Sequence, residues 1–105
     1  MRISTRSTLG LGITLLFSSS MAIADGRTAE QIYTTSCATC HATGVANAPK
    51  AHDSAAWKAR AKSMDQLVAS SKKGINAMPP MGLCADCTDA ELKAAISLMM
   101  SEKKE

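Results

Sequence analysis

The sequence has few aromatic residues, no long apolar run and little net charge. Aromatics make up 3% of the 105 residues, as one Phe, one Tyr and one Trp. So short a chain allows one small domain. With so few large side chains, its hydrophobic core is too small to stabilise the fold unless a disulfide or a bound group contributes as well. The formal net charge is only +3, and no region joins a dense basic patch to aromatics, which argues against a nucleic-acid partner.

The most apolar stretch lies near the N-terminus and is too short to span a membrane, which takes about 20 apolar residues. Arg2 and Arg6 precede the apolar run 9–17, and small residues follow it. A basic start, a short apolar centre and a small-residue end are typical of a secretory signal peptide. We therefore expect residues 1–24 to be cleaved and residues 25–105 to form one exported domain. The alternative, an uncleaved anchor, is disfavoured by the length of the run.

The remaining sequence predicts an all-α domain of three or four helices. Three segments begin with a capping box, in which a Ser or Thr and a Glu or Gln three residues later each satisfy a free backbone N–H of the first turn. A fourth begins after Asp53, and no stretch alternates polar and apolar residues as strands do. The stretches 44–52 and 75–87 contain Gly and Pro, and loops of this length in a small domain are usually functional. The expected helices cover residues 28 to about 37, 54–61, 63–73 and 88 to about 102.

The segment Cys37-Ala38-Thr39-Cys40-His41 has the spacing of a c-type haem attachment site. Two thiols three residues apart can each add to one vinyl group of the porphyrin, and the following His can then bind the iron. We therefore expect thioether links at Cys37 and Cys40, with His41 as the proximal iron ligand. Export agrees with this interpretation, because c-type haem is attached outside the cytoplasm.

The two cysteine pairs leave two other interpretations open. Cys37 and Cys40 could form a zinc site with Cys84 and Cys87, since four thiolates suit tetrahedral zinc. The pairs lie farther apart than the roughly 15–20 residues of common zinc ribbons, however, and His41 would then have no role. Either pair could also be a thiol redox motif, although the strand–helix–strand pattern of such proteins is missing.

The sixth ligand of such a haem iron is expected to be a methionine thioether, the usual choice in electron carriers. Two candidates lie in the second loop, in Met78-Pro79-Pro80-Met81. Proline fixes its own φ and forces the preceding residue into an extended form, so Met78 is held on a stiff support. The sequence favours Met78 and keeps Met81 as its rival.

Taken together, these motifs resemble those of the class I c-type cytochromes, and specifically of the cytochrome c5 subgroup. The resemblance covers nearly all of residues 25–105. It implies a small class I cytochrome c fold, with three to four helices wrapped around one covalently attached haem c. Its motifs are residues 37–41, 44–50 and 76–80, and most specifically Cys84 and Cys87 followed by residues 88–96.

The resemblance assigns roles to individual residues of the haem site. It implies that Cys37 and Cys40 carry the thioether links and that His41 and Met78 are the axial ligands. It also matches Pro49 to a proline whose carbonyl accepts a hydrogen bond from the ligand imidazole. Such a bond fixes the tautomer of the ring and strengthens it as a ligand.

Outside the ligand set, the resemblance implies a disulfide between Cys84 and Cys87, which would brace the methionine loop against the last helix. At Met81 the chain departs from relatives that often carry Lys, and this adds a rival sulfur and a more apolar rim. His52 is expected to be a surface residue. Trp57 is expected to pack against the ring in preference to binding a haem propionate.

The function implied is that of a soluble periplasmic one-electron carrier, cycling between Fe(II) and Fe(III), and not of an enzyme. With both axial positions filled, the iron has no open site for a substrate. Expected partners are periplasmic or membrane redox proteins that dock briefly near Ala38-Thr39 and the 79–82 rim, and a weak homodimer through the same rim is left open. The alternatives are a gas-binding or haem-enzyme module with an open sixth position, and a haem subunit of a larger oxidase or reductase.

Overall fold

The computed structural model describes residues 26–60 and 62–103, and within these ranges the chain is helical and contains no strand. This confirms the predicted all-α class. The expected signal peptide, residues 1–24, lies outside the described residues. The α-helices are α1 (Ala29–Ile32), α2 (Ala38–His41), α3 (Ser54–Lys58), α4 (Met64–Lys73) and α5 (Asp89–Met100).

Side-chain caps fix the residues at which the helices begin. The hydroxyls of Thr28, Ser63 and Thr88 each accept a hydrogen bond from the backbone N–H three residues later, and the side-chain oxygen of the Gln or Glu at that position accepts one from the backbone N–H of the capping residue. The carboxylate of Asp53 caps α3 in the same way. The predicted starts are confirmed, because a cap is a local interaction that the sequence shows directly.

The helix ends agree less closely with the sequence. α4 ends at Lys73, and Gly74 caps it as expected, with a φ of 83° that favours glycine. α5 ends at Met100, whereas the sequence predicted about residue 102. A helix end depends on which groups satisfy the last carbonyls. At α5 the carbonyl of Met99 accepts from the N–H of His52 in a distant loop, and that of Leu98 accepts from Ser101 just after the helix.

The first helix continues farther than predicted, to His41 instead of about Cys37. A π-helical turn, Tyr33–Cys37, joins α1 to α2 without a break. Within it the hydroxyl of Thr35 donates to the carbonyl of Gln31 at 2.7 Å, a type of bond that competes with the backbone ladder and bends helices. Wide turns of this kind concentrate at functional sites, and this one leads directly into the haem-type motif.

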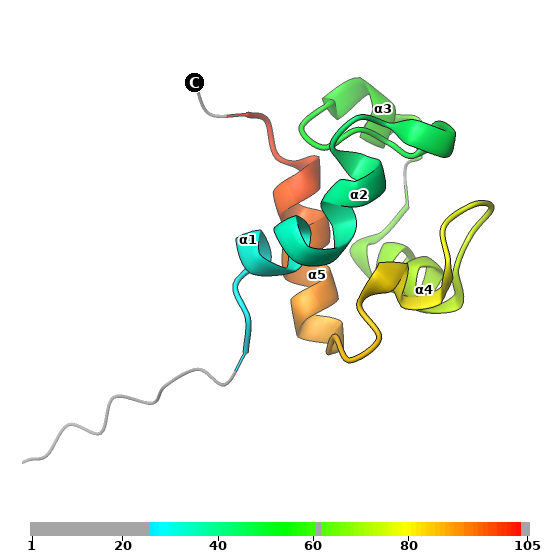
Figure 1. Ribbon diagram of the computed structural model, residues 1–105. Coiled ribbons are helices and arrows are strands. Elements are labelled where there is room, and N and C mark those ends of the chain that lie inside the picture. The colour runs from blue at the N-terminus through cyan, green and yellow to red at the C-terminus, as the bar shows by residue number, and fades with distance from the viewer. Residues whose placement is uncertain (1–25, 61, 104–105) are drawn as a thin grey trace, which may run out of the picture.

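The core lies where α1 and the π-turn Tyr33–Cys37 pack against α5, and α4 packs against α5 as well (Figure 1). Ile32 of α1 is fully buried, and the predicted apolar stripe of α5 is buried opposite it. Burying one such side chain stabilises the fold by about 1.5–3 kcal/mol. The stripe consists of Leu92, Ala95, Ile96 and Met99.

None of the helices in the described ranges is both long and apolar enough to cross a membrane.

The start of α5 is held by an ion-pair cluster and a disulfide. Arg27 donates from Nε to Glu91 at 2.7 Å, and its Nη1 lies 3.1 Å from Asp86. This guanidinium is the main reason why the pKa of Glu91 is lowered to about 2, and a backbone N–H at the helix start assists it. Cys84 and Cys87, both buried, are bonded to each other just before the helix. The methionine loop and the segment before α1 are therefore both tied to this end of α5.

Candidate functional site

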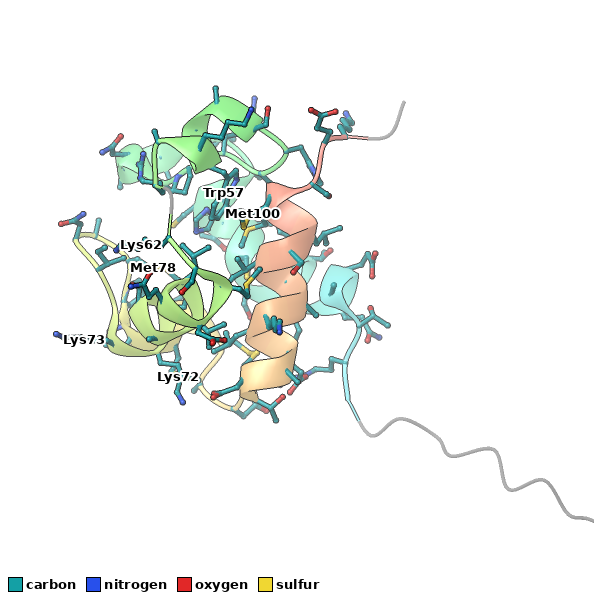
Figure 2. The ribbon with its side chains drawn as sticks, turned by 180° about the vertical axis from the view of Figure 1, so that it is seen from behind. Trp57, Lys62, Lys72, Lys73, Met78 and Met100 are labelled. Atoms are coloured by element: carbon teal, nitrogen blue, oxygen red, sulfur yellow. A yellow bond between two sulfur atoms is a disulfide. The ribbon has the colours of Figure 1, made fainter. Side chains whose placement is uncertain are left out.

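One cavity gathers the residues that the sequence assigned to a haem. Its volume is about 510 Å³, and its walls come from α2, α4, α5 and the two long loops. Cofactor sites of proteins range over about 300–1,000 Å³, so the volume suits a prosthetic group. Figure 2 shows Trp57 toward the C-terminal end of α5 and Met78 toward α4. The predicted residues that line the cavity are Cys37, Cys40, His41, Pro49, Met78 and its rival Met81.

The ring of His41 is held in one orientation by its neighbours. Its Nδ1 lies 2.8 Å from the carbonyl oxygen of Pro49. A carbonyl can only accept, so Nδ1 carries the proton and the lone pair of the neutral ring lies on Nε2. Trp57 stacks on the ring, with 5.8 Å between centroids and 18° between planes. The N–H of Ala51 also donates to the backbone carbonyl of His41 at 2.7 Å, so Nε2 is presented as a ligand on a fixed support.

Cys37 and Cys40 are free thiols on the cavity wall, both partly buried. They lie on the same continuous helix as His41, so one element presents both sulfurs and the imidazole to the cavity. Burial raises the pKa of the Cys37 thiol. The protonated S–H is therefore its main form at neutral pH, and this is the form that adds across a carbon–carbon double bond to give a thioether.

Met78 and Met81 both line the cavity, but their backbones differ. Met78 pairs with Ile75 through two hydrogen bonds, of 2.9 and 3.1 Å, and Pro79 follows it. Met81 has a φ of 65°, in the left-handed region. A Cβ at Gly82 would lie 2.7 Å from the methyl carbon of Met78, so the glycine provides the space in which that methyl lies. The stiff support predicted for Met78 is present.

Backbone strain is concentrated around the cavity. Five of its non-glycine residues have positive φ, an arrangement that persists only where the surroundings over-determine it and that clusters at binding sites. The two Asn residues tolerate the left-handed region. The other three give no sequence signal of it. The five residues are Ala46 (52°), Asn47 (63°), Asn76 (50°), Met81 (65°) and Leu83 (66°).

The mouth of the cavity is apolar and cationic. Val45, Ile75 and Leu83 line it and are 48%, 44% and 61% exposed. Arg60 and Lys62 line it too, whereas no described Asp or Glu does. The guanidinium of Arg60 is fixed by a 2.5 Å hydrogen bond to a backbone carbonyl of the first loop. Sequence reasoning missed Arg60, Ile75 and Leu83, because no motif marks them, and it gave Val45 no role although the motif 44–50 contains it. The positions of these residues depend on how the two loops fold.

Two residues outside the ligand set have clear positions in the structure. The indole N–H of Trp57 donates to the carbonyl of Lys50 at 3.0 Å, and the ring is buried. This agrees with the expected packing role. His52, expected to be a surface residue, lies at the surface but makes an exposed side-chain hydrogen bond. It is half-buried, and its Nδ1 lies 2.8 Å from the carbonyl of Ser101.

The two alternative interpretations of the cysteines find no support in this geometry. Because Cys84 and Cys87 are bonded to each other, they have no thiolates for a four-cysteine zinc site. Across residues 26–60 and 62–103, no group of three or more His, Cys, Asp and Glu side chains could hold a metal ion. The same ranges contain no strand of the kind that a thioredoxin-like motif needs.

The residues of the cavity fit a c-type haem. Two free thiols and an imidazole with its Nε2 lone pair lie on one helix, and a thioether lies on a separate loop of the same cavity. These are the donor groups that covalent attachment and six-coordinate iron require. Apolar side chains from α4 and α5 complete the walls, including Leu67, Leu92, Ile96 and Met99.

Comparison with known proteins agrees with this chemistry. A family described as "Cytochrome C oxidase, cbb3-type, subunit III" matches residues 24–99. Cytochrome c5 of Azotobacter vinelandii is 54% identical over 76 residues, which cover 70% of this chain and 92% of that protein.

Solved structures give the same picture. A mono-heme ferrocytochrome c from Shewanella putrefaciens is 53% identical with a TM-score of 0.66, covering 76% of this chain and all of that one. A chain in an electron transfer complex of nitrite reductase with cytochrome c is 45% identical with a TM-score of 0.62, covering 69% of this chain and 89% of its own.

Proposed function

Since the chain belongs to the class I c-type cytochromes, in the cytochrome c5 subgroup, we propose that His41 and Met78 are the axial ligands of its haem iron and that Cys37 and Cys40 carry the haem. The protein is a monohaem electron carrier with one covalently attached haem c. When bound, haem c supplies an iron that takes up and releases one electron. The proposal rests mainly on one observation: Cys37, Cys40, His41 and Met78 all line the same cavity.

Each side chain of the site has a separate task. Pro49 accepts the Nδ1 proton of His41, and this bond orients the ring and raises its basicity as a ligand. The thioether of Met78 is a neutral, soft ligand that favours the less charged, reduced state. Its backbone is fixed by Ile75 and Pro79, so little rearrangement accompanies electron transfer. With both axial positions held by side chains, no site remains for a substrate, and we propose no enzymatic activity.

The partners we propose are periplasmic or membrane redox proteins that dock at the mouth of the cavity. Val45, Ile75 and Leu83 form an apolar centre there, beside the positive charges of Arg60 and Lys62. A partner with an apolar centre and an acidic rim fits this surface, and weak redox encounters use small interfaces.

Reversal of charge at the mouth tests this docking site. Lys62→Glu should slow electron transfer to such a partner at low salt, and the difference should fade as salt screens the charge. Equal slowing at all salt concentrations would contradict charge-assisted docking. A weak homodimer through the same face would instead appear as concentration-dependent sedimentation that Leu83→Asp abolishes.

We also propose that the protein is exported, with residues 1–24 removed as a signal peptide. Covalent attachment of haem to a Cys-x-x-Cys-His segment takes place outside the cytoplasm, and the family match begins at residue 24, where the signal is expected to end. The N-terminal sequence of the protein purified from the periplasmic fraction should begin at Asp25. Retention of Met1 would contradict this.

A second candidate is a haem subunit of a larger oxidase, because the matching family is described as an oxidase subunit. The free carrier is favoured because the match spans 92% of a small cytochrome c5. Native size analysis of detergent-solubilised membranes distinguishes the two. A free carrier stays in the soluble fraction as a small protein, whereas a subunit co-migrates with a large complex.

The experiment that tests the ligand set compares Met78→Ala with Met81→Ala in the oxidised holoprotein. Met78→Ala should abolish the weak long-wavelength charge-transfer band of thioether-ligated iron, and Met81→Ala should keep it. Loss of the band in Met81→Ala alone would transfer the role to Met81. A band unchanged in both variants would show that neither methionine is required on its own and would refute Met78 as the ligand. Absence of the band from the wild-type protein would favour the gas-binding or haem-enzyme alternative.

A further inference from the structure

His52 makes two short hydrogen bonds to the C-terminal end of α5. Its backbone N–H donates to the carbonyl of Met99 at 2.7 Å, and its Nδ1 lies 2.8 Å from the carbonyl of Ser101. Because a carbonyl only accepts, Nδ1 carries a proton in this contact. The last carbonyls of a helix lack intrahelical partners. Here a loop residue from the other half of the chain supplies the partner of the Met99 carbonyl, whereas Ser101 supplies that of Leu98.

The backbone of His52 has a strained conformation where it contacts the end of α5. Its φ is 66°, in a region that few non-glycine residues adopt. Among the described non-glycine residues with positive φ, His52 alone does not line the cavity. Strain of this kind persists only where the surrounding contacts maintain it. Here these are the turn that the N–H of Asp53 closes onto the carbonyl of Lys50 at 3.1 Å and the bonds of His52 to α5.

The segment that carries His52 also holds His41. Pro49 accepts the Nδ1 proton of His41 at 2.8 Å, and the N–H of Ala51 donates to the carbonyl of His41 at 2.7 Å. Ala51 is buried and directly precedes His52. Residues 49–52 thus connect His41 on one side to α5 on the other, and α5 lines the same cavity through Met99.

We propose that His52 is a positioning residue for His41. It fixes residues 49–52 on the end of α5, and through Pro49 it sets the orientation and hydrogen-bond strength of the His41 imidazole. This rests on the proposed role of His41 as an iron ligand. Without the bond to Ser101, the segment gains freedom and the bond between His41 and Pro49 weakens. A weaker bond at Nδ1 makes the imidazole a poorer electron donor, so the oxidised state loses stabilisation and the reduction potential rises.

Two substitutions separate the ring contact from the backbone conformation. Glycine and asparagine both tolerate positive φ, but H52G removes the side-chain donor whereas H52N keeps an amide N–H. In the holoprotein, H52G should shift the hyperfine-shifted ring signals of His41. It should also change the ratio of oxidised to reduced protein about threefold at a fixed potential, or about 30 mV, because tenfold corresponds to 59 mV for one electron. H52N should keep the His41 ring signals and the reduction potential close to their wild-type values.

A matched control distinguishes positioning from general stability. T28A removes the cap of α1, which does not line the cavity, and should lower Tm without moving the potential or the His41 signals. If H52G lowers Tm as T28A does and also leaves both readouts at their wild-type values, the proposal is overturned. Should H52G yield no holoprotein, H52D takes its place, because aspartate tolerates positive φ and its carboxylate has no N–H to donate. A wild-type protein without the thioether band would refute the proposed ligand set, whatever the His52 variants show.

Discussion

Single residues decide whether Met78 can reach into the cavity. Met78 lies where a Cβ on Gly82 would be 2.7 Å from its methyl carbon, and Gly82 itself has a φ of 55°. Gly82→Ala should therefore displace the methionine and destabilise the fold by about 1 kcal/mol or more, because alanine is strained at positive φ. The measurement is the charge-transfer band together with thermal unfolding. Gly26→Ala, which meets nothing within 4 Å, is the control, and equal spectra for the two variants would contradict the prediction.

At the residue scale the sequence predicts the chemistry better than the geometry. The attachment motif and Pro79 pointed to His41 and Met78, because spacing and proline stiffness are properties of the local chain. The positive φ of Ala46 and Leu83 could not be predicted, since both residues disfavour that region and only the packing of the loops imposes it. The hydrogen bonds of His52 could not be predicted for the same reason, because its partners lie at the far end of the chain.

Among the elements, α5 shows how a helix is held from both ends. At its start Arg27 lowers the pKa of Glu91 to about 2, against an ordinary value of 4.5. A carboxylate with a lowered pKa contributes stability that is fully present above the unfolded-state pKa and is lost as pH falls through the folded one. This contribution should therefore be complete above about pH 4.5 and should disappear by about pH 2.

The change Arg27→Gln tests this contribution to the stability of α5. The variant should have a lower Tm than the wild type at pH 6, and the two melting temperatures should converge near pH 2. Glu91→Gln should show the same dependence of Tm on pH. The Tm of the double variant should be little lower than that of either single variant, because the two side chains interact directly. A Tm difference that is constant over the whole pH range would show that Arg27 acts through packing and not through the carboxylate.

Helix starts could be predicted from the sequence, whereas helix continuations and ends could not. The caps at Thr28, Ser63 and Thr88 are local and were read correctly. The π-turn Tyr33–Cys37 was not, since it depends on competition between hydroxyls and backbone that composition alone does not resolve. The end of α5 at Met100 was placed about two residues too late, because its last carbonyls bond to Ser101 and, from a distant loop, to His52.

The whole molecule is built around a cavity of about 510 Å³ and has a small core of its own. Two loops far apart in the sequence meet on this cavity, and their apolar side chains line its mouth. A domain of this size rarely gains more than about 3–5 kcal/mol from its core. The scarcity of aromatic residues predicts that a group filling this cavity, together with the Cys84–Cys87 disulfide, adds to the stability of the described part of the chain.

Mass analysis of the tryptic fragment 28–50 from the purified holoprotein is the most direct check of covalent haem attachment. This fragment follows Arg27, ends at Lys50 and contains both cavity thiols. It should weigh one haem more than its amino acids, with the added mass localised to Cys37 and Cys40. A fragment that carries two unmodified thiols, in protein from cells able to attach haem, would contradict the account.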